Sequence, residues 1–270
     1  MTQAHPPRAK KSLGQHFLGD KNICRKIVDL LQITSGDNVI EIGPGPGALS
    51  DLLMESAANR LVLLEKDKYW AGERQKVAPP KAQTVLTDAL TMAWERITPD
   101  NPWKIIGNLP YNVASLLMWD IFSQATGLTR AVFMVQREVG DRLVAVPGNK
   151  TYGALSVWVQ SFVAPRMVMV VGPQSFNPPP KVDSAVLIFS PLPEGQRPQH
   201  PRILAKLIKI CLQNRRKQLG SIFRQHHVPA WEHACYVNGI AHDRRPETLS
   251  PTDFQQIAAF FAGNRLDFDG

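Results

Sequence analysis

Hydrophobic residues in this chain gather in short runs that alternate with longer amphipathic stretches. The short runs are rich in aliphatic side chains and end at glycine, proline or polar residues, a pattern typical of buried strands. Helical spacing fills most of the gaps, and this alternation predicts a doubly wound α/β sheet. The predicted strands are 38–42, 60–65, 83–86, 103–106, 130–135, 166–171 and 184–189.

The connection between the last two predicted strands differs from the others. It reads GPQSFNPPPKVD at residues 172–183 and is too rich in proline for a crossover helix. Because antiparallel strands need no such helix, we expect these two strands to pair antiparallel. The predicted sheet is therefore mostly parallel, with one antiparallel strand.

The pattern changes again near residue 190. Residues 190–201, SPLPEGQRPQHP, have the composition of a linker, and residues 202–225 carry helical spacing beyond it. Residues 250–263 open with a Ser/Thr/Asp cluster suited to a helix N-cap and end at a glycine. The C-terminal part is predicted to be a small helical domain. The predicted divisions are an arm at 1–19, an α/β domain at 20–192 and a helical domain at 193–270.

Composition and charge narrow the class of protein. The chain has 270 residues and a mean hydropathy of −0.17, and no apolar run approaches the roughly 18 residues of a membrane span. The three cysteines are far apart and lack CxxC spacing, so we expect neither disulfides nor a metal site, and a cytoplasmic location. The net charge of +8 favours a polyanionic partner, although charge alone leaves nucleic-acid binding open.

The first motif with chemical meaning is VIEIGPGPGALSDLL, residues 39–53. A strand runs into Gly43, Gly45 and Gly47 and then into a helix, so the backbone can approach a ligand closely at the end of the strand. A nucleotide-like ligand is expected there. The alternative is a tight strand-to-helix turn without a ligand.

Two carboxylates follow the next two predicted strands. Glu65 comes twenty-two residues after Gly43, where a carboxylate can accept hydrogen bonds from both hydroxyls of a ribose. Asp88 ends the third strand at the same edge of the sheet. The alternatives are a solvated charge for Glu65 and a helix cap for Asp88.

The order of these motifs resembles a known family. EIGPGPG followed by EKD, TDA and GNLPY resembles S-adenosylmethionine-dependent enzymes that methylate the exocyclic amine of adenine. With KKSLGQHFL at 10–18, MVQREVGDRL at 134–143, YGALSV at 152–157 and SFNPPPKVDSAV at 175–186, the chain resembles the ribosomal RNA adenine dimethyltransferases. The resemblance spans nearly the whole chain and implies a Rossmann-like class I methyltransferase sheet with S-adenosylmethionine as cofactor.

The GNLPY motif fits that chemistry. The lone pair of an adenine amine is delocalised into the ring, so the enzyme must hold the nitrogen in line with the methyl donor. Asn108 offers an amide oxygen, and Pro110 keeps Leu109 extended so that its carbonyl can also accept from the amine. Tyr111 offers a flat face for the base. The alternative is a proline-terminated turn with a packed tyrosine.

The resemblance also implies roles for matching residues. His16 and Leu18 would lie near the methionine end of the cofactor, with Gly43, Gly45 and Asn108 also against the cofactor. Glu65 would bind the ribose, and Asp88 the adenine amine. Phe176 would stack on the target base opposite Tyr111. A surface histidine, a core leucine and a core phenylalanine are the alternatives.

Basic residues concentrate in the predicted helical tail, and its spacing predicts a helix that carries Arg215, Arg216 and Lys217. In a protein that resembles rRNA methylases, contact with RNA backbone is expected, although a solvated face is the usual explanation for such residues. The family implies that two adjacent adenosines near the 3′ end of small-subunit rRNA are dimethylated within a pre-ribosomal particle, and we expect a monomer. The predicted RNA-binding residues are Lys206, Lys209, Arg215, Arg216, Lys217 and Arg224.

Three other functions compete with this one. A large-subunit rRNA methylase that confers antibiotic resistance would use the same chemistry, but the sizeable tail and FNPPPKVDS favour the small subunit. A non-catalytic assembly or transcription factor could keep the fold, although the intact NLPY argues against it. A nicotinamide-dependent oxidoreductase would match the loose glycine pattern and leave GNLPY unexplained.

Overall fold

The computed structural model describes residues 16–110, 112–266 and 268. The chain divides into two compact units: residues up to Gly140 with Arg166–Phe189 form the first, and Asp141–Pro165 with the residues from Ser190 onward form the second. The second unit thus includes 141–165, which the sequence assigned to the α/β domain. The predicted domain boundaries themselves stay predictions. None of the helices in the described ranges is long and apolar enough to cross a membrane.

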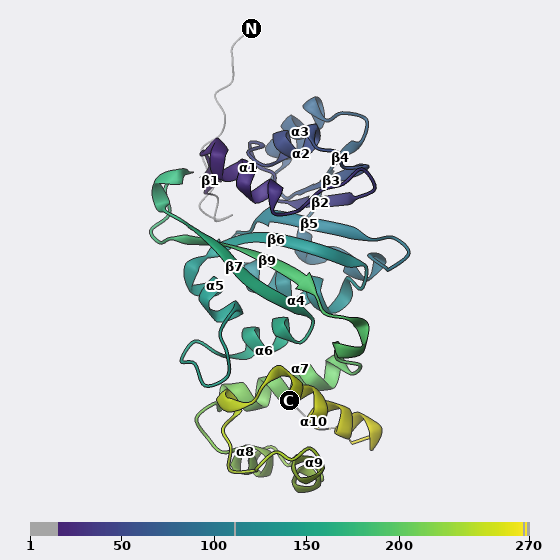
Figure 1. Ribbon diagram of the computed structural model, residues 1–270, viewed down its shortest axis with the longest axis vertical. Coiled ribbons are helices and arrows are strands. Elements are labelled where there is room, and N and C mark those ends of the chain that lie inside the picture. Colours follow the sequence, from purple (N-terminus) through teal and green to yellow (C-terminus); the bar gives the residue numbers. More distant parts are fainter. Residues whose placement is uncertain (1–15, 111, 267, 269–270) are drawn as a thin grey trace. The chain divides into compact units, whose positions relative to one another are not determined.

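The first unit is built on a mixed seven-stranded sheet in the order β4-β3-β2-β5-β6-β9-β7 (Figure 1). The strands β2 to β6 pair in parallel, whereas β9 is antiparallel to β6 and lies beside β7. The mostly parallel sheet and all seven predicted strands are confirmed. Their bounds are β2 Asn38–Ile42, β3 Arg60–Glu65, β4 Ala82–Leu86, β5 Trp103–Asn108, β6 Leu128–Gln136, β7 Val163–Val171 and β9 Ser184–Pro191.

Helices cover both faces of this sheet, which is why its central strands read as continuous apolar runs. Side chains of α1 (Lys21–Asp29) and α2 (Ser50–Glu55) share one buried cluster with alternate residues of the strands, among them Val132 and Met134. Phe133 points to the opposite face and packs against Phe122 of α4 (Ala114–Gln124), with ring centroids 6.2 Å apart. The helices α3 (Lys68–Val77) and α5 (Arg137–Leu143) follow β3 and β6 along the chain.

The strand register brings the ends of three parallel strands together. Ile42 lies beside Leu64 of β3 on one side and beside Gly107 of β5 on the other. A Cβ atom at Gly107 would lie 2.7 Å from the Ile42 carbonyl, so only glycine allows this approach. The glycine-rich segment after β2, Glu65 at the end of β3 and Asn108 at the end of β5 therefore meet at one edge.

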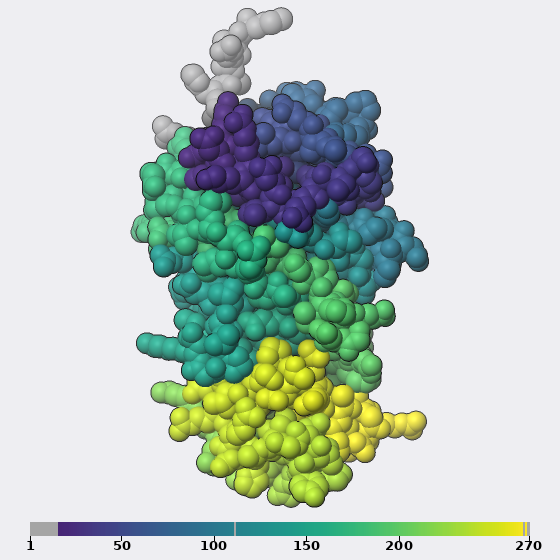
Figure 2. Space-filling model, in the orientation of Figure 1, coloured from purple at the N-terminus to yellow at the C-terminus, as the bar shows by residue number. Residues whose placement is uncertain are grey.

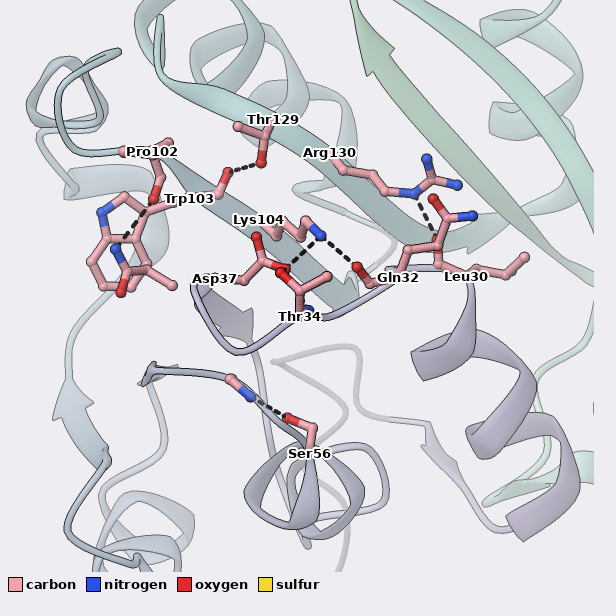
Figure 3. Close-up of polar contacts among 12 residues, drawn as sticks. Leu30, Gln32, Thr34, Asp37, Ser56, Pro102, Trp103, Lys104, Thr129 and Arg130 are labelled. Atoms are coloured by element: carbon pink, nitrogen blue, oxygen red, sulfur yellow. Dashed lines mark hydrogen bonds and ion pairs between the residues drawn. The ribbon is translucent and has the colours of Figure 1, made fainter.

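At the opposite end of β5, an ion pair ties the start of the strand to the loop before β2 (Figure 3). Lys104 Nζ lies 2.7 Å from Asp37 Oδ2 and also donates to the Gln32 carbonyl at 2.5 Å. The two side chains of the pair are only 12% and 20% exposed. Burial alone would raise the pKa of Asp37, but hydrogen bonds from Lys104 and Thr34 outweigh it and lower the pKa.

Replacing Lys104 with Met should lower the free energy of unfolding by about 1 to 3 kcal/mol, because it leaves a half-buried carboxylate without its cation. The pKa of Asp37 is lower in the folded state than in the unfolded state, where it is about 3.9. The ionised Asp37 therefore stabilises the fold at pH values above about 4, and this contribution is lost as the pH falls. The difference between parent and variant, measured by urea unfolding, should therefore shrink below about pH 4. Lys76→Met, which removes an exposed pair with Glu73, is the control and should change little. A pH-independent difference would contradict the assignment.

The second unit is helical. Its helices are α6 Ala154–Gln160, α7 Pro201–Gln213, α8 Leu219–Gln225, α9 Trp231–Val237 and α10 Pro251–Gly263. The predicted N-cap of α10 is confirmed: Ser250 accepts the Asp253 N–H at 3.1 Å, and Asp253 accepts the Ser250 N–H at 3.0 Å. Figure 2 shows the yellow-green helices α8 and α9 at the surface in this view.

The expected helical placement of Arg215, Arg216 and Lys217 is wrong. The three residues lie in a turn between α7 and α8. Contacts distant in sequence explain the break, because the first N–H groups of α8 donate to carbonyls of residues 242 and 244 instead of to a preceding helical turn. Helical spacing in the sequence carries no information about such partners.

Candidate active site

A cavity of about 140 Å³ lies at the carboxyl ends of β2, β3 and β5. This edge is where open parallel sheets hold ligands. Residues from five separate segments of the first unit line the cavity, including the segment that follows β4. Of the residues that sequence analysis singled out, those lining it are His16, Gly43, Gly45, Glu65, Asp88, Asn108, Leu109 and Pro110.

The glycine-rich segment has a backbone that requires glycine. Gly43, Gly45 and Gly47 have φ angles of 70°, 51° and 103°, in the left-handed region. A Cβ atom at Gly45 would also lie 3.0 Å from the ring of Phe17. At Gly47 a Cβ would lie 2.0 Å from the guanidinium of Arg74. The tight turn considered in the sequence analysis is present, and the same bare backbone lines the cavity at Gly43 and Gly45.

Glu65 connects the glycine-rich segment to the end of β3. Its Oε2 accepts the Gly45 N–H at 2.9 Å, and its Oε1 accepts the Asp67 N–H at 2.8 Å. The residue is only 5% exposed, and burial raises the pKa of its carboxyl, partly offset by these two hydrogen bonds. Each carboxylate oxygen can accept a second hydrogen bond. Glu65 therefore shapes the cavity and keeps acceptor capacity toward it.

Asp88 performs the capping role that the sequence left open. Its Oδ1 accepts the Leu90 N–H at 3.1 Å at the start of the short helix Ala89–Thr91. Its Oδ2 lies 2.7 Å from Lys66 Nζ, and this hydrogen bond is the main cause of a lowered pKa. The carboxylate is thus held ionised at the cavity wall.

Asn108, Leu109 and Pro110 lead from β5 into α4. Asn108 Nδ2 donates to the main-chain carbonyl of His16 at 2.9 Å. Leu109 is buried and donates its N–H to the Met134 carbonyl at 3.0 Å, while the Pro110 carbonyl accepts the N–H of Ala114 at 3.1 Å. Tyr111, predicted to face the target base, lies outside the described residues.

A two-stranded sheet that contributes Phe17 to the cavity wall was missed by sequence analysis. β1 (Phe17–Leu18) pairs antiparallel with β8 (Phe176–Asn177), so Leu18 and Phe176 lie opposite one another. Both are 5% exposed and belong to the hydrophobic core rather than to the cavity wall. Their cofactor and base-stacking roles stay predictions, and their burial matches the core alternatives. Phe17, which sequence analysis did not select, lines the cavity and lies 5.6 Å from the Trp70 ring.

Sequence analysis also missed a buried carboxylate, that of Glu41. Glu41 lies within β2, is 1% exposed, and accepts the Ser50 hydroxyl at 2.6 Å. Burial raises the pKa of Glu41 to about 8, against the attraction of the nearby Arg74. The available signal was a charged residue in an otherwise apolar strand. Among the described residues there is no group of histidine, cysteine and carboxylate side chains suited to a metal ion.

Comparison with known families decides the class of protein. The family model described as "Ribosomal RNA adenine dimethylase" matches residues 7–263. The chain belongs to the ribosomal RNA adenine dimethylase family. The family predicted from the motifs is therefore confirmed, and GNLPY and the glycine-rich segment lie within the matched region.

Individual members of the rRNA adenine dimethylase family resemble the chain over nearly its full length. A protein of Oleidesulfovibrio alaskensis named "Ribosomal RNA small subunit methyltransferase A" is 56% identical over 258 residues, which cover 94% of this chain and 92% of that protein. Two solved structures share the fold. A dimethyladenosine transferase from Plasmodium falciparum has a TM-score of 0.78 at 24% identity, covering 94% of this chain and 100% of the other. The 23S rRNA methyltransferase ErmE has a TM-score of 0.67 at 23% identity, covering 90% and 98%.

The six basic residues that sequence analysis predicted to bind RNA differ in their surroundings. Arg215 uses its guanidinium within the second unit: Nε lies 2.8 Å from Glu247, and the terminal nitrogens donate to the carbonyls of Tyr152 and Lys150 at 3.1 and 3.0 Å. Arg216 is exposed, and Lys217 donates to Gln225 at 2.9 Å. The others are Lys206, which donates to the Phe268 carbonyl, the exposed Lys209, and Arg224, which lies 5.6 Å from the Trp231 ring centroid.

Proposed function

We propose that this protein transfers methyl groups from S-adenosylmethionine to the N6 amines of two adjacent adenosines near the 3′ end of small-subunit rRNA. The product would be dimethyladenosine in both positions, formed during ribosome biogenesis. The main observation that supports this proposal is that Asn108 lines the same cavity as Glu65 and Asp88 in a member of the rRNA adenine dimethylase family. A nucleotide-like donor and an adenine amine can thus meet at one place.

The cavity fits the proposed cofactor. Gly43 and Gly45 expose backbone without side chains, which allows close approach of the methionine and ribose portions. Glu65 has acceptor capacity for ribose hydroxyls, and the ionised Asp88 can accept from an exocyclic amine. When bound, the cofactor supplies an electrophilic methyl group on a positively charged sulfur. His16 and Phe17 border the same space.

The residues of the chain would act mainly by positioning the target amine. Asn108 Oδ1 and the Leu109 carbonyl would accept hydrogen bonds from its two N–H groups, which turns the nitrogen lone pair toward the methyl group. Because the donor is already activated, the amine proton can leave to water, and the step needs neither a strong base nor a metal. Tyr111 would stack on the base. Phe176 would join it only after leaving the core position described above.

Charge supports RNA as the substrate. The second unit has 13 lysines and arginines against 8 aspartates and glutamates, whereas residues 16–140 and 166–189 have 15 of each. The excess positive charge thus lies in the second unit and in the first fifteen residues. We infer phosphate contact by the second unit. A pre-ribosomal particle as the bound form, a monomeric state and a cytoplasmic location are parts of the same proposal.

The surroundings of the two neighbouring arginines lead to different expectations. Arg216→Ala should weaken RNA binding and reduce the slope of log affinity against log salt concentration by up to about one unit, because one phosphate contact is lost. Arg215→Ala should instead lower the thermal stability, because it breaks hydrogen bonds within the second unit. The measurement is RNA binding over a salt series combined with thermal unfolding. If log affinity falls with log salt concentration at the same slope for Arg216→Ala and the parent, Arg216 belongs to a solvated face.

The decisive experiment for the function uses small ribosomal subunits from an unmethylated source. Incubation with labelled S-adenosylmethionine should place label on two adjacent adenosines near the 3′ end of the rRNA, as N6,N6-dimethyladenosine. Naked large-subunit RNA is the parallel substrate, and labelling only there would favour the antibiotic-resistance methylases. No transfer to either substrate, with cofactor bound, would favour a non-catalytic factor. Calorimetry with nicotinamide dinucleotides tests the oxidoreductase alternative.

A further inference from the structure

We propose that the main-chain carbonyl of His16 orients the Asn108 amide for methyl transfer, which makes the residue that leads into β1 a positioning residue of the active site. This inference rests on the proposed function, because it concerns how that site holds its acceptor atom. Sequence analysis associated His16 with the cofactor. The hydrogen bond between Asn108 Nδ2 and the His16 oxygen, 2.9 Å long, assigns it an additional role.

The chemistry of the two groups determines which way the amide faces. A main-chain carbonyl oxygen can only accept, so the amide nitrogen of Asn108 must be the atom that faces His16. The amide is planar, and Oδ1 is therefore directed to the other side of the group. Asn108 lines the cavity at the end of β5. The acceptor atom proposed for the target amine is thus oriented by a contact with a different segment of the chain.

The position of His16 is itself held by several contacts with the β8 region. Its Nδ1 lies 2.8 Å from the Pro178 carbonyl, where it donates a hydrogen bond. Immediately beyond β1, the Gly19 N–H donates to the Ser175 carbonyl at 2.8 Å. The antiparallel pairing and the buried Leu18 and Phe176 side chains lie between these two contacts. The carbonyl that orients Asn108 is therefore fixed relative to the proline-rich segment.

This arrangement explains an asparagine at position 108 rather than an aspartate. A carboxylate would also offer an acceptor to the target amine, but its second oxygen would face the His16 carbonyl and repel it. A neutral carboxylic acid can donate one hydrogen bond and accept another, as the amide does. The Asn108→Asp variant should therefore have the parent's hydrogen-bond pattern only when its new side chain is protonated.

The test compares single-turnover methyl transfer by parent, Asn108→Asp and Asn108→Ala at saturating cofactor and RNA, from pH 5.5 to pH 8.5. Relative to parent at each pH, Asn108→Asp should be at least about tenfold slower at pH 8.5 and should recover severalfold toward pH 5.5. Asn108→Ala should be slow at every pH. If Asn108→Asp transfers methyl groups as fast as the parent above pH 7, the inference is wrong. A hydrogen-bond acceptor at position 108 would then be sufficient without the contact to His16.

Other titratable groups face the same cavity and need a control. His16, Glu65, Lys66 and Asp88 all line it and are common to parent and variants, so the ratio of rates removes their shared contribution. Asn38→Asp is the matched control for the new carboxyl. Asn38 also donates to a main-chain carbonyl, that of Pro102 at 3.3 Å, but at the start of β2. Its methyl-transfer rate should equal the parent rate throughout.

A readout without RNA separates this inference from the proposed function. Repulsion from the His16 carbonyl should raise the folded-state pKa of the new carboxyl in Asn108→Asp above the unfolded value of about 3.9. Its melting temperature, relative to parent, should then fall as the pH rises above about 4 and level off at higher pH. A flat difference would overturn the orienting contact, whatever the activity. The expected fall, together with a parent that methylates no adenosine, would leave the contact intact and refute the function.

Discussion

Glu65→Ala is expected to weaken binding of S-adenosylmethionine by about 1 to 3 kcal/mol, or roughly 5- to 150-fold in Kd. The side chain would no longer accept from the ribose hydroxyls, and the Gly45 N–H would lose its partner, so the glycine-rich segment would also become less ordered. Isothermal titration calorimetry measures the change directly. RNA affinity determined without cofactor should stay close to that of the parent.

Two further observations make the Glu65 result interpretable. Glu55→Ala removes an exposed carboxylate of the first unit and should leave cofactor affinity unchanged. Thermal unfolding of Glu65→Ala then shows whether lost affinity follows from lost folding. An unchanged Kd in a folded Glu65→Ala variant would refute the ribose-binding assignment and leave Glu65 with the structural role that its two backbone hydrogen bonds demonstrate.

Asn108→Ala should slow methyl transfer by at least about tenfold, since each 1.4 kcal/mol of lost transition-state stabilisation corresponds to about that factor. The variant loses the proposed acceptor Oδ1, while Glu65 and Asp88 remain in place for the cofactor. Single-turnover rates and cofactor affinity, measured on the same preparation, separate the two effects. Tyr111→Ala is expected to act likewise through lost stacking.

The matched control for Asn108→Ala is Asn101→Ala, an exposed asparagine before β5. It should retain the parent rate. If the Asn108→Ala rate equals the parent rate, the target amine is held elsewhere and the active site has been placed wrongly. A parallel loss of rate and cofactor affinity would instead make Asn108 primarily a cofactor ligand, the second role that the family resemblance implied.

Local pattern was sufficient for most of the sheet. Strands such as β2 and β5 are buried on both faces, so they appear as apolar runs, and Gly43 and Gly107 mark where they end or approach a neighbour. Because parallel strands end at one edge, the placement of Glu65, Asp88 and Asn108 around one cavity also followed from their positions at strand ends. The family itself was recognisable from motif order.

Features that depend on contacts distant in sequence were not predictable in this way. β1 and β8 are two residues long, too short for any periodicity, and their pairing joins segments about 160 positions apart. The orientation of Asn108 toward His16, and the entry of Phe17 rather than Leu18 into the cavity wall, depend on that pairing. Without the pairing, the sequence could name His16 but not its partner.

The sequence by itself determined the seven strands of the main sheet, the α10 cap, the family and eight of the residues that line the cavity, because each of these follows from local patterns and motifs along the chain. The tertiary structure decided the break between α7 and α8, the use of Arg215 inside the second unit and the raised pKa of Glu41. Burial and long-range hydrogen bonds set these three features. A helical pattern or a charged residue looks the same in sequence whether its partner is water, RNA or a carbonyl brought close by folding.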